Sequence, residues 1–371
     1  MLAAWSTIAR WQRMLIGAWC AWLVVPAVVA YVLLSGPQRK SRLDSARRHV
    51  ERMDVTKNDA VHTEIDTTRP PGHESDVPTV VTVGVYLARI PDFSIVGSSW
   101  TADFYVWFKW DDERVTPGET FKIVNGEIVS RTLMTKIDKD AHHYAIYRVL
   151  AHMTKSFDTA RFPRDDHLLT IALEDQGLPA YSMVYVADAV TSEMSSRVEI
   201  PGYAILPAEI VAKLHTYKTS MGNPSFPPMS KITYAELVFG IPIARPSWGL
   251  FFKMFVAMYV AIALGLAALF VRGPAERLGL TSTALFLAVM NGMEITSLTP
   301  DTGIATLSDV INGIGYFTIG QMIIQSVIYY RYFSDPEKDR DVARIFDRVS
   351  VAVLTAMILL LNVGVLAAAS E

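Results

Sequence analysis

Five apolar runs constrain this chain more than any other feature of its sequence. They are residues 14–34, 248–271, 278–298, 310–330 and 349–369. An α-helix needs about 20 predominantly apolar residues to cross the hydrocarbon core of a bilayer, and each run has that length. Hydrophobic residues make up 51% of the 371 residues, and the excess is concentrated in these runs. We therefore predict a multi-pass membrane protein with five spanning helices.

The first run indicates an N-terminal anchor. It follows Arg10 and Arg13 and is longer than the apolar core of about 7–15 residues that signal peptides contain. We predict that residues 1–36 form a retained transmembrane anchor, with a cleaved signal as the alternative. Residues 37–75 are charged, poor in large apolar side chains and end near Pro70, Pro71 and Gly72. This composition predicts a linker whose first half could form an exposed helix.

Residues 76–246 have the sequence pattern of a β domain. The sequence VPTVVTVGVYLARI, from Val77, alternates apolar and polar residues, and WTADFYVWFKWDD, from Trp100, carries aromatics at every second position. Further strands are predicted at residues 120–123, 128–133, 143–157, 168–174, 183–186, 204–217 and 231–243. Short strands without long helices between them predict an antiparallel β-sandwich, followed by a four-helix transmembrane domain at 247–371.

Charged residues in the connections predict the orientation. Arg272 and Arg277 separate the second and third runs, and five basic residues separate the fourth and fifth, whereas residues 299–309 contain no Lys or Arg. The positive-inside rule then makes the basic connections cytoplasmic and puts the β domain and C-terminus outside. The cluster Arg39, Lys40, Arg42, Arg47 and Arg48 disagrees with this rule, and lipid headgroup contact is the account we give it.

The third run has a polar face. Alternating steps of three and four from Glu276 give Glu276, Gly279, Thr283, Phe286, Met290, Met293 and Ser297. This face is small and polar at its start, bulky and apolar in its middle and polar at its end. Leu280, Leu285, Leu287 and Val289 make the opposite face apolar. Such a helix can line a pore. The alternative is a helix packed in a bundle, whose Ser and Thr hydroxyls bond back to its own carbonyls.

Three motifs carry a resemblance to a known family. They are TADFYVWFKWDD, FDTARFPRDDHLLTI and the ungapped run from Glu276 and Arg277 through Pro300. With an outer β-sandwich before four helices, the chain from Val77 to Ala369 resembles the pentameric ligand-gated ion channels, the Cys-loop receptor superfamily. The family's bridging cysteines would fall at Lys155 and Leu169, so the resemblance is to prokaryotic members that lack them. The family's WxPD element is missing, and the N-terminal anchor is additional.

The resemblance implies a homopentameric, ligand-gated, cation-selective channel of a bacterial inner membrane. Its partners would be four further copies, the lipid bilayer, permeant cations and a small-molecule, ion or proton ligand, with no cofactor. Glu276 would form a carboxylate ring at the inner mouth, and Coulomb attraction there would favour cations. Gly279 and Thr283 would form the filter, and Phe286, Met290 and Met293 an apolar gate. Glu294 would add a second acidic ring near Ser297.

The resemblance also implies coupling and ligand sites. The coupling residues are Asp92, Phe162, Pro163, Asp165, Arg245 and Pro300, with an ion pair between Asp165 and Arg245. The ligand residues are the aromatics Trp107, Trp110, Tyr181, Tyr217, Phe226 and Tyr234, near a lid at residues 218–231. His142 and His143 could bind a metal or sense pH, but neighbouring residues of a strand face opposite sides and form no chelate alone.

Other functional classes are disfavoured by the sequence. The net charge of −3 and the lack of basic stretches interleaved with aromatics argue against a nucleic-acid partner. We find no triad, phosphate loop or metal-ligand spacing, so we predict that the protein is not an enzyme. A transporter is disfavoured because the helices show no internal repeat. The alternative function is a non-conducting, membrane-anchored periplasmic sensor or assembly protein with the same fold.

Overall fold

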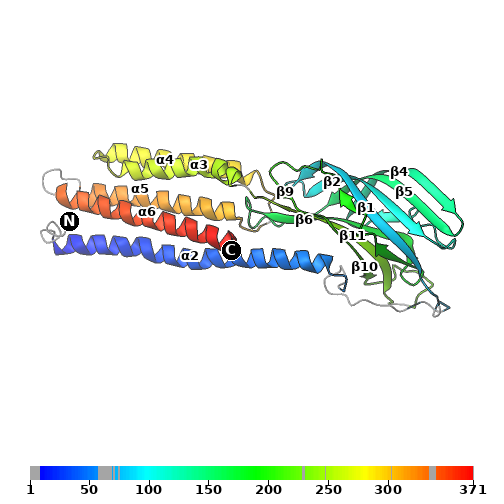
Figure 1. The fold of residues 1–371 in the computed structure, drawn as a ribbon. Coiled ribbons are helices and arrows are strands. Elements are labelled where there is room, and N and C mark those ends of the chain that lie inside the picture. The colour runs from blue at the N-terminus through cyan, green and yellow to red at the C-terminus, as the bar shows by residue number, and fades with distance from the viewer. Residues whose placement is uncertain are drawn as a thin grey trace. The chain divides into compact units, whose positions relative to one another are not determined.

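The computed structural model describes residues 9–56, 69, 72–73, 76–227, 230–246, 248–301, 303–333 and 340–370. The chain divides into two compact units (Figure 1). The helical unit combines Met1–Leu43, Thr159–Asp165 and Ser247–Glu371, and the β unit combines Asp44–Asp158 and Asp166–Pro246. A seven-residue segment between two strands therefore belongs to the helical unit.

The β unit contains two sheets. The first has the strand order β4-β5-β2-β1-β7, and β8 also pairs with β1. Its strands are β1 (Thr79–Ser94), β2 (Ser99–Trp110), β4 (Gly126–Lys139), β5 (His142–Thr154), β7 (Met183–Ala187) and β8 (Glu193–Met194). The second has the order β10-β11-β6-β3, and β9 also pairs with β11. Its strands are β3 (Phe121–Ile123), β6 (Asp166–Pro179), β9 (Ala204–Ile205), β10 (Glu209–Tyr217) and β11 (Ile232–Ala244).

Every predicted strand segment overlaps a strand of the structure, with two differences. Strand β1 pairs in parallel with β7 and β8, so the prediction of a wholly antiparallel sandwich is wrong at this edge. These strands are far from β1 in sequence, so no tight hairpin fixes their direction. The predicted strand at residues 204–217 is two strands, β9 and β10, because Pro207 between them has no N–H to donate to a ladder.

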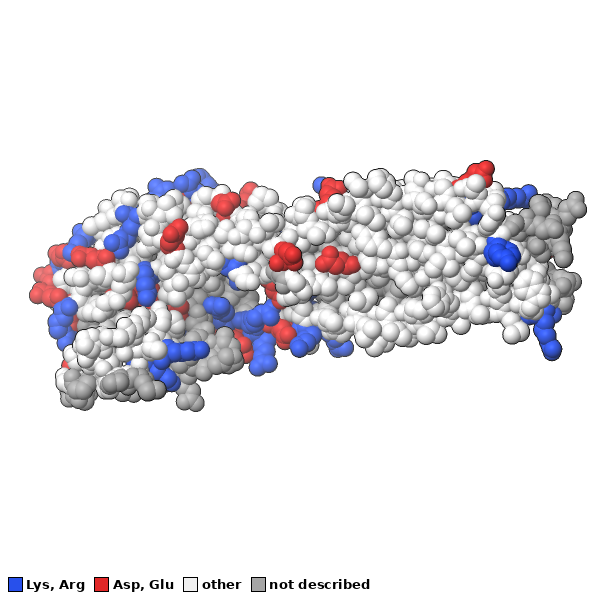
Figure 2. Space-filling view, turned by 180° about the vertical axis from the view of Figure 1, so that it is seen from behind, with Lys and Arg blue, Asp and Glu red and all other residues white. Residues whose placement is uncertain are grey.

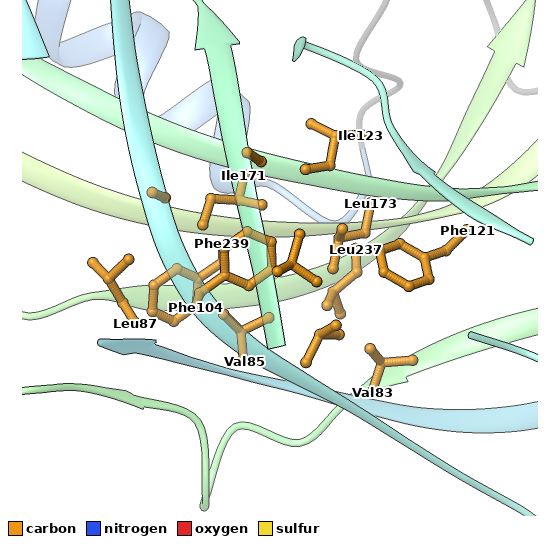
Figure 3. Packing of buried hydrophobic residues seen from close by; sticks show 14 of the residues in the cluster. Val83, Val85, Leu87, Phe104, Phe121, Ile123, Ile171, Leu173, Leu237 and Phe239 are labelled. Carbon is orange, nitrogen blue, oxygen red and sulfur yellow. The ribbon is translucent and has the colours of Figure 1, made fainter. Parts of the chain in front are cut away.

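The two sheets pack face to face around one apolar core. Figure 3 shows that side chains of β1 and β2 meet side chains of β3, β6 and β11. Val83, Val85, Leu87 and Phe104 from the first sheet are fully buried, as are Ile171, Leu173, Leu237 and Phe239 from the second. Alternate residues of a strand point to one face, so the period-two pattern of the sequence becomes this core.

The helical unit contains most of α2 (Arg10–Met53) and all of α3 (Gly249–Ala268), α4 (Pro274–Thr296), α5 (Leu307–Tyr332) and α6 (Arg340–Ser370). By length and composition α2, α3, α4 and α6 could cross a membrane, which makes four candidate spans among the described residues. Helix α5 is not one of them, and its crossing stays a prediction. It buries the polar side chains of Asn312, Thr318, Gln321, Gln325 and Ser326, which lower its hydropathy.

Helix α2 is a single element of 44 residues that continues past the predicted anchor. Its first part packs within the helical unit. The indole Nε1 of Trp19 donates to Ser350 Oγ of α6 at 3.0 Å, and that of Trp22 donates to Gln321 Oε1 of α5 at 2.8 Å. From Asp44 onward the helix belongs to the β unit. Much of the remaining predicted linker, residues 57–68, 70–71 and 74–75, lies outside the described residues.

Candidate pore face and coupling loop

The start of α4 is set by local sequence. Gly273 is extended at the N-cap, and Pro274 follows as the first helical residue, where a missing N–H costs nothing. A Cβ at position 273 would collide with Glu276 Oε2, so glycine lets this carboxylate fold back over the helix start. The helix dipole favours an anion there. Glu276 is nevertheless solvent-exposed, so its charge is available at this end of the helix.

One face of α4 is unpacked in the subunit. All eight residues predicted for pore and selectivity are exposed: Glu276, Gly279, Thr283, Phe286, Met290, Met293, Glu294 and Ser297. Phe286 exposes 67% of its surface and Met293 65%, which are large values for apolar side chains. This face therefore has no packing partner among the described residues of the chain.

The opposite face packs against α3 and α5, and it differs from the predicted one. Its buried residues are Arg277, Thr281, Ala284, Ala288, Asn291, Gly292 and Ile295. Leu280, Leu285 and Leu287 are only half-buried, and Val289 is exposed. Small side chains let helices approach closely in a membrane, and there packing rather than a hydrophobic driving force holds helices together.

The hydroxyl of Thr283 bears on both roles predicted for the polar residues of this helix, which are lining a pore and bonding back to a carbonyl of the helix itself. Its Oγ1 donates to the carbonyl oxygen of Gly279 at 2.9 Å, as Ser and Thr do in apolar helices. The donated hydrogen leaves the lone pairs of Oγ1 available, because a hydroxyl has one donor and two acceptor sites. The exposed oxygen can therefore still accept a hydrogen bond or contact a cation.

Arg277 leaves the exposed face, because it follows Glu276 and adjacent residues of a helix point about 100° apart. Its side chain is fully buried, and Nη2 donates to Asp347 Oδ1 of α6 at 2.7 Å and to the carbonyl oxygen of Leu269. The guanidinium lies 4.1 Å from the ring centroid of Tyr329 in α5. Gln325 of α5 also donates to Asp347, at 3.1 Å. One polar cluster thus joins α4, α5, α6 and the end of α3.

The segment Thr159–Asp165 lies within the motif FDTARFPRDDHLLTI, and it folds with the helices. Phe162 is buried in the helical core, and the Phe162–Pro163 peptide bond is cis. The carbonyl oxygen of Phe162 accepts from Ser308 Oγ at 3.0 Å, and that of Ala160 accepts from the Leu307 N–H at 2.8 Å. The first N–H groups of a helix lack partners within the helix. The loop supplies acceptors for the N–H groups of Leu307 and Ser308, the first two residues of α5.

The same loop contacts the start of α3. The Arg164 guanidinium lies 4.2 Å from the ring centroid of Trp248, the N-cap residue of α3. The loop is continuous in sequence with β5 on one side and β6 on the other. It is therefore linked to strands of the β unit through the chain and to the starts of two helices through non-covalent contacts.

The remaining predicted coupling residues are Asp92, Asp165, Arg245 and Pro300. Asp165 is buried in the helical unit, whereas Arg245 stacks 4.1 Å over the ring of Tyr203 in the β unit. Their ion pair stays a prediction. Asp92 is exposed on β1, opposite Thr101 of β2, and Pro300 is half-buried in the connection between α4 and α5.

Four of the six predicted ligand residues lie in one aromatic cluster of the β unit. The rings of Tyr217 and Tyr234 are 5.8 Å apart at 85°, and those of Tyr181 and Phe226 are 6.4 Å apart. Tyr234 of β11 is in register with Pro179 of β6, which brings the start of β11 beside Tyr181. Tyr217 precedes the predicted lid at residues 218–231 and Phe226 belongs to it, whereas residues 228–229 of the lid lie outside the described residues.

A buried carboxylate that the sequence prediction missed organises this cluster. Glu174 accepts from Tyr217 Oη at 2.6 Å, pairs with Lys122 Nζ at 2.9 Å and lies 3.1 Å from His215 Nδ1. Burial opposes ionisation of Glu174, but these partners outweigh it and lower its pKa. Burial and the bond to Glu174 raise the pKa of Tyr217. A charged residue at the end of the apolar run LLTIALE was the available signal.

Lys122 makes the aromatic cluster unusual. Its Nζ lies 5.3 Å from the ring centroid of Tyr217 and 5.8 Å from that of Tyr234. Aromatic faces attract cations at this distance. The protein's own ammonium therefore occupies the position that a cationic ligand would take over these two rings.

The two predicted tryptophans are not part of this cluster. Trp107 packs against Gly84, and its Nε1 donates to Asp188 Oδ2 at 3.1 Å. Trp110 is buried and stacks on His143, with ring centroids 5.2 Å apart. Both tryptophans are on β2, in the first sheet, whereas Tyr217 and Tyr234 are in the second.

The predicted histidines pair with separate carboxylates. His142 Nδ1 lies 2.7 Å from Asp111, and His143 Nδ1 lies 2.7 Å from Asp138. The hydrogen bond with Asp111 raises the pKa of His142. Within the described ranges, no group of three or more His, Cys, Asp or Glu residues is placed to hold a metal ion.

The comparisons with known proteins add no assignment. The chain matches no protein-family model, and no curated protein matches it significantly.

Proposed function

We propose that this protein is the subunit of a ligand-gated, cation-selective channel, a homopentamer of the bacterial inner membrane. The observation that carries the proposal is the exposed face of α4, which has a carboxylate at its start, small and polar residues next and bulky apolar residues beyond them. The resemblance to pentameric ligand-gated channels supports the number of subunits. It also supports the placement of the β domain and the C-terminus outside.

A comparison with other helices argues against lipid as the neighbour of this face. Apart from Lys253 near the start of α3, the exposed residues Phe252, Val256 and Val260 of that helix are apolar, as are Leu359, Leu360 and Val363 of α6. Those faces suit lipid. On α4, Glu276, Gly279 and Thr283 are exposed in one line with Phe286. Charged side chains in membrane segments usually face the bundle interior or a water-filled cavity.

The mechanism of conduction follows from the sequence of side chains along α4. Five copies of Glu276 around an axis would attract cations and repel anions in a narrow, partly desolvated mouth. Gly279 has no neighbouring atom within 4 Å of its Cβ position, so nothing in the subunit fills the space beside the filter. Phe286 and Met290 would form a constriction that closes by excluding water, and Met293 would extend it.

Gating requires that a conformational change in the β unit alter the helices. The segment Thr159–Asp165 is suited to transmit that change. The loop is tied to strands β5 and β6 by the chain and to the starts of α3 and α5 by contacts. A shift of these strands on ligand binding would pull on both helix starts. The aromatic cluster around Tyr217 and Tyr234 is the ligand site we propose, at the interface between subunits.

The direct test is to record currents from the purified protein in lipid bilayers. A tenfold KCl gradient and a panel of pH values and small ligands would be applied. We expect ligand- or pH-dependent currents that reverse near the potassium equilibrium potential, about 60 mV from zero. Purified pentamers that remain silent under all these conditions would favour the non-conducting sensor instead.

Replacing Phe286 with serine should open the constriction. A hydroxyl in place of a phenyl ring lets water enter, so we expect currents without ligand and at least about tenfold higher open probability. Phe252→Ser is the matched control, because Phe252 of α3 is a similarly exposed phenylalanine, at 64% against 67%. Single-channel recording of both variants measures the difference. Equal open probability in Phe286→Ser and Phe252→Ser would remove Phe286 as the gate.

A further inference from the structure

A surface cavity of about 160 Å³ lies in the β unit, where the end of α2 meets the end of β5 and the start of β6. It is lined by Ser45, Arg48, His49, Arg52, Lys155, Ser156, Asp158, Asp166, His167 and Leu168. Most of these side chains are charged or polar. The cavity is separate from the aromatic cluster and from α4.

Lys155 is the group in this cavity whose charge is not balanced. It is partly buried, and within the described ranges its Nζ forms no ion pair or hydrogen bond. Its Nζ lies 5.9 Å from the ring centroid of Phe157. Burial, with the charges of Arg52 and Arg48, lowers the pKa of Lys155 to about 8. Although Asp158 and Asp166 line the same cavity, neither forms an ion pair with this ammonium.

The carboxylates in this cavity have other partners. Asp158 pairs with Arg48, and Asp166 accepts from Ser45 Oγ at 3.3 Å. His49 and His167 complete the titratable lining. With both histidines neutral, three cations face two carboxylates, so the lining keeps a net positive charge. The ion pair of Arg48 also gives one member of the basic cluster after the anchor a role within the protein.

We propose that this cavity binds a small oxyanion of the carboxylate or phosphate class, with Lys155 as its principal partner. Burial destabilises the charged form of the lysine, and an anion beside Nζ would restore the electrostatic stabilisation of its ammonium. The hydroxyl of Ser156 lines the same cavity and can donate to an anion oxygen, whereas the hydroxyl of Ser45 already donates to Asp166. The site needs no conduction, so it stands independently of the proposed channel function.

The position of Arg48 favours a soluble anion over a lipid headgroup as the source. Arg48 follows the last residue of the apolar run, Leu34, by 14 positions of the same helix. At about 1.5 Å per residue this is roughly 21 Å along α2. Headgroups lie within only several ångströms of the hydrocarbon boundary.

The test measures thermal unfolding of the full-length protein in detergent with added sulfate, at ionic strength matched by NaCl. Sulfate keeps its charge near and above neutral pH, so pH changes report on the protein. We expect sulfate to raise the Tm of the wild type, and Lys155→Gln to weaken the apparent affinity at least about tenfold. Lys136→Gln, on exposed strand β4, is the control and should behave as the wild type.

Two further measurements test the role of Lys155 and the source of the anion. Raising the pH from about 7 to about 9.5 should shrink the wild-type response, because Lys155 loses its proton near pH 8. Lys155→Gln, measured over the same pH range, reports the part of the change that does not depend on Lys155. Inorganic phosphate and short-chain phosphatidylglycerol are then compared. Lys155-dependent binding of phosphate alone assigns a soluble anion, and binding of the lipid alone assigns a headgroup. An equal response in Lys155→Gln and wild type, or no response to any of these probes, would overturn the proposal.

Discussion

Replacing Glu276 with glutamine is expected to move the reversal potential in a tenfold KCl gradient from about 60 mV toward zero. The substitution removes a negative charge from each subunit without changing the size of the side chain. Because Glu276 is exposed at the start of α4, five such changes would remove the attraction that concentrates cations in the mouth. Chloride would then enter, and the measurement is the permeability ratio of potassium to chloride.

Glu294→Gln is the matched control for this substitution. Glu294 is also exposed on α4 but lies near the other end of the helix, beside the predicted lining residues. We expect it to change the permeability ratio less than Glu276→Gln does. Unchanged ratios in Glu276→Gln would show that this carboxylate is only a helix N-terminal charge favoured by the dipole.

Replacing Arg277 with methionine is expected to lower the free energy of unfolding by about 3–5 kcal/mol. The cause is that Asp347 loses its cationic partner. Asp347 is largely buried, and within the described residues only the Gln325 amide would still donate a hydrogen bond to it. The contact of the guanidinium with Tyr329 would also be lost. Unfolding by denaturant in detergent measures the loss.

Arg344→Met is the control for Arg277→Met. Arg344 is an exposed arginine of α6 that approaches Asp341 at 3.6 Å, and such surface pairs contribute about 0–1 kcal/mol. The double variant Arg277→Met with Asp347→Leu should recover much of the stability, because no unpaired charge remains. Equal losses in Arg277→Met and Arg344→Met would contradict the role of the buried cluster.

Features with a local cause were predictable from the sequence. The period-two pattern around Val83 and Phe104 located the strands, and apolar length located the helices. The phase of α4 was predictable because 3.6 residues per turn fixes which side chains share a face. The predicted lining residues are accordingly exposed together.

Features that depend on distant contacts were not predictable. Strand β7 joins β1 in parallel across about ninety residues of chain, which no local pattern indicates. The small residues Ala284, Ala288 and Gly292 pack α4, where leucines were expected. Whether a small side chain lies at a contact between helices depends on which helix is its neighbour. The sequence alone does not identify that helix.

The aromatic cluster shows the same limit of prediction from sequence. Tyr217 and Tyr234 face each other, but alternation on β2 could not tell that Trp107 and Trp110 contact Asp188 and His143 instead. Glu174 and Lys122 come from different strands, β6 and β3, which meet only in the folded sheet. Their pairing with Tyr217 became visible from the geometry.

The most direct test of the account asks whether the exposed face of α4 meets water inside the membrane. The sequence has a single cysteine, Cys20, so Cys20→Ser gives a background free of thiols. On it, Thr283→Cys tests the lining face and Val256→Cys tests the exposed, apolar face of α3. A cationic, water-soluble thiol reagent is applied in lipid bilayers while current is recorded. We predict that the reagent modifies Thr283→Cys and blocks its current but leaves Val256→Cys unmodified. A Thr283→Cys thiol as unreactive as Val256→Cys would contradict the account, because α4 would then face lipid.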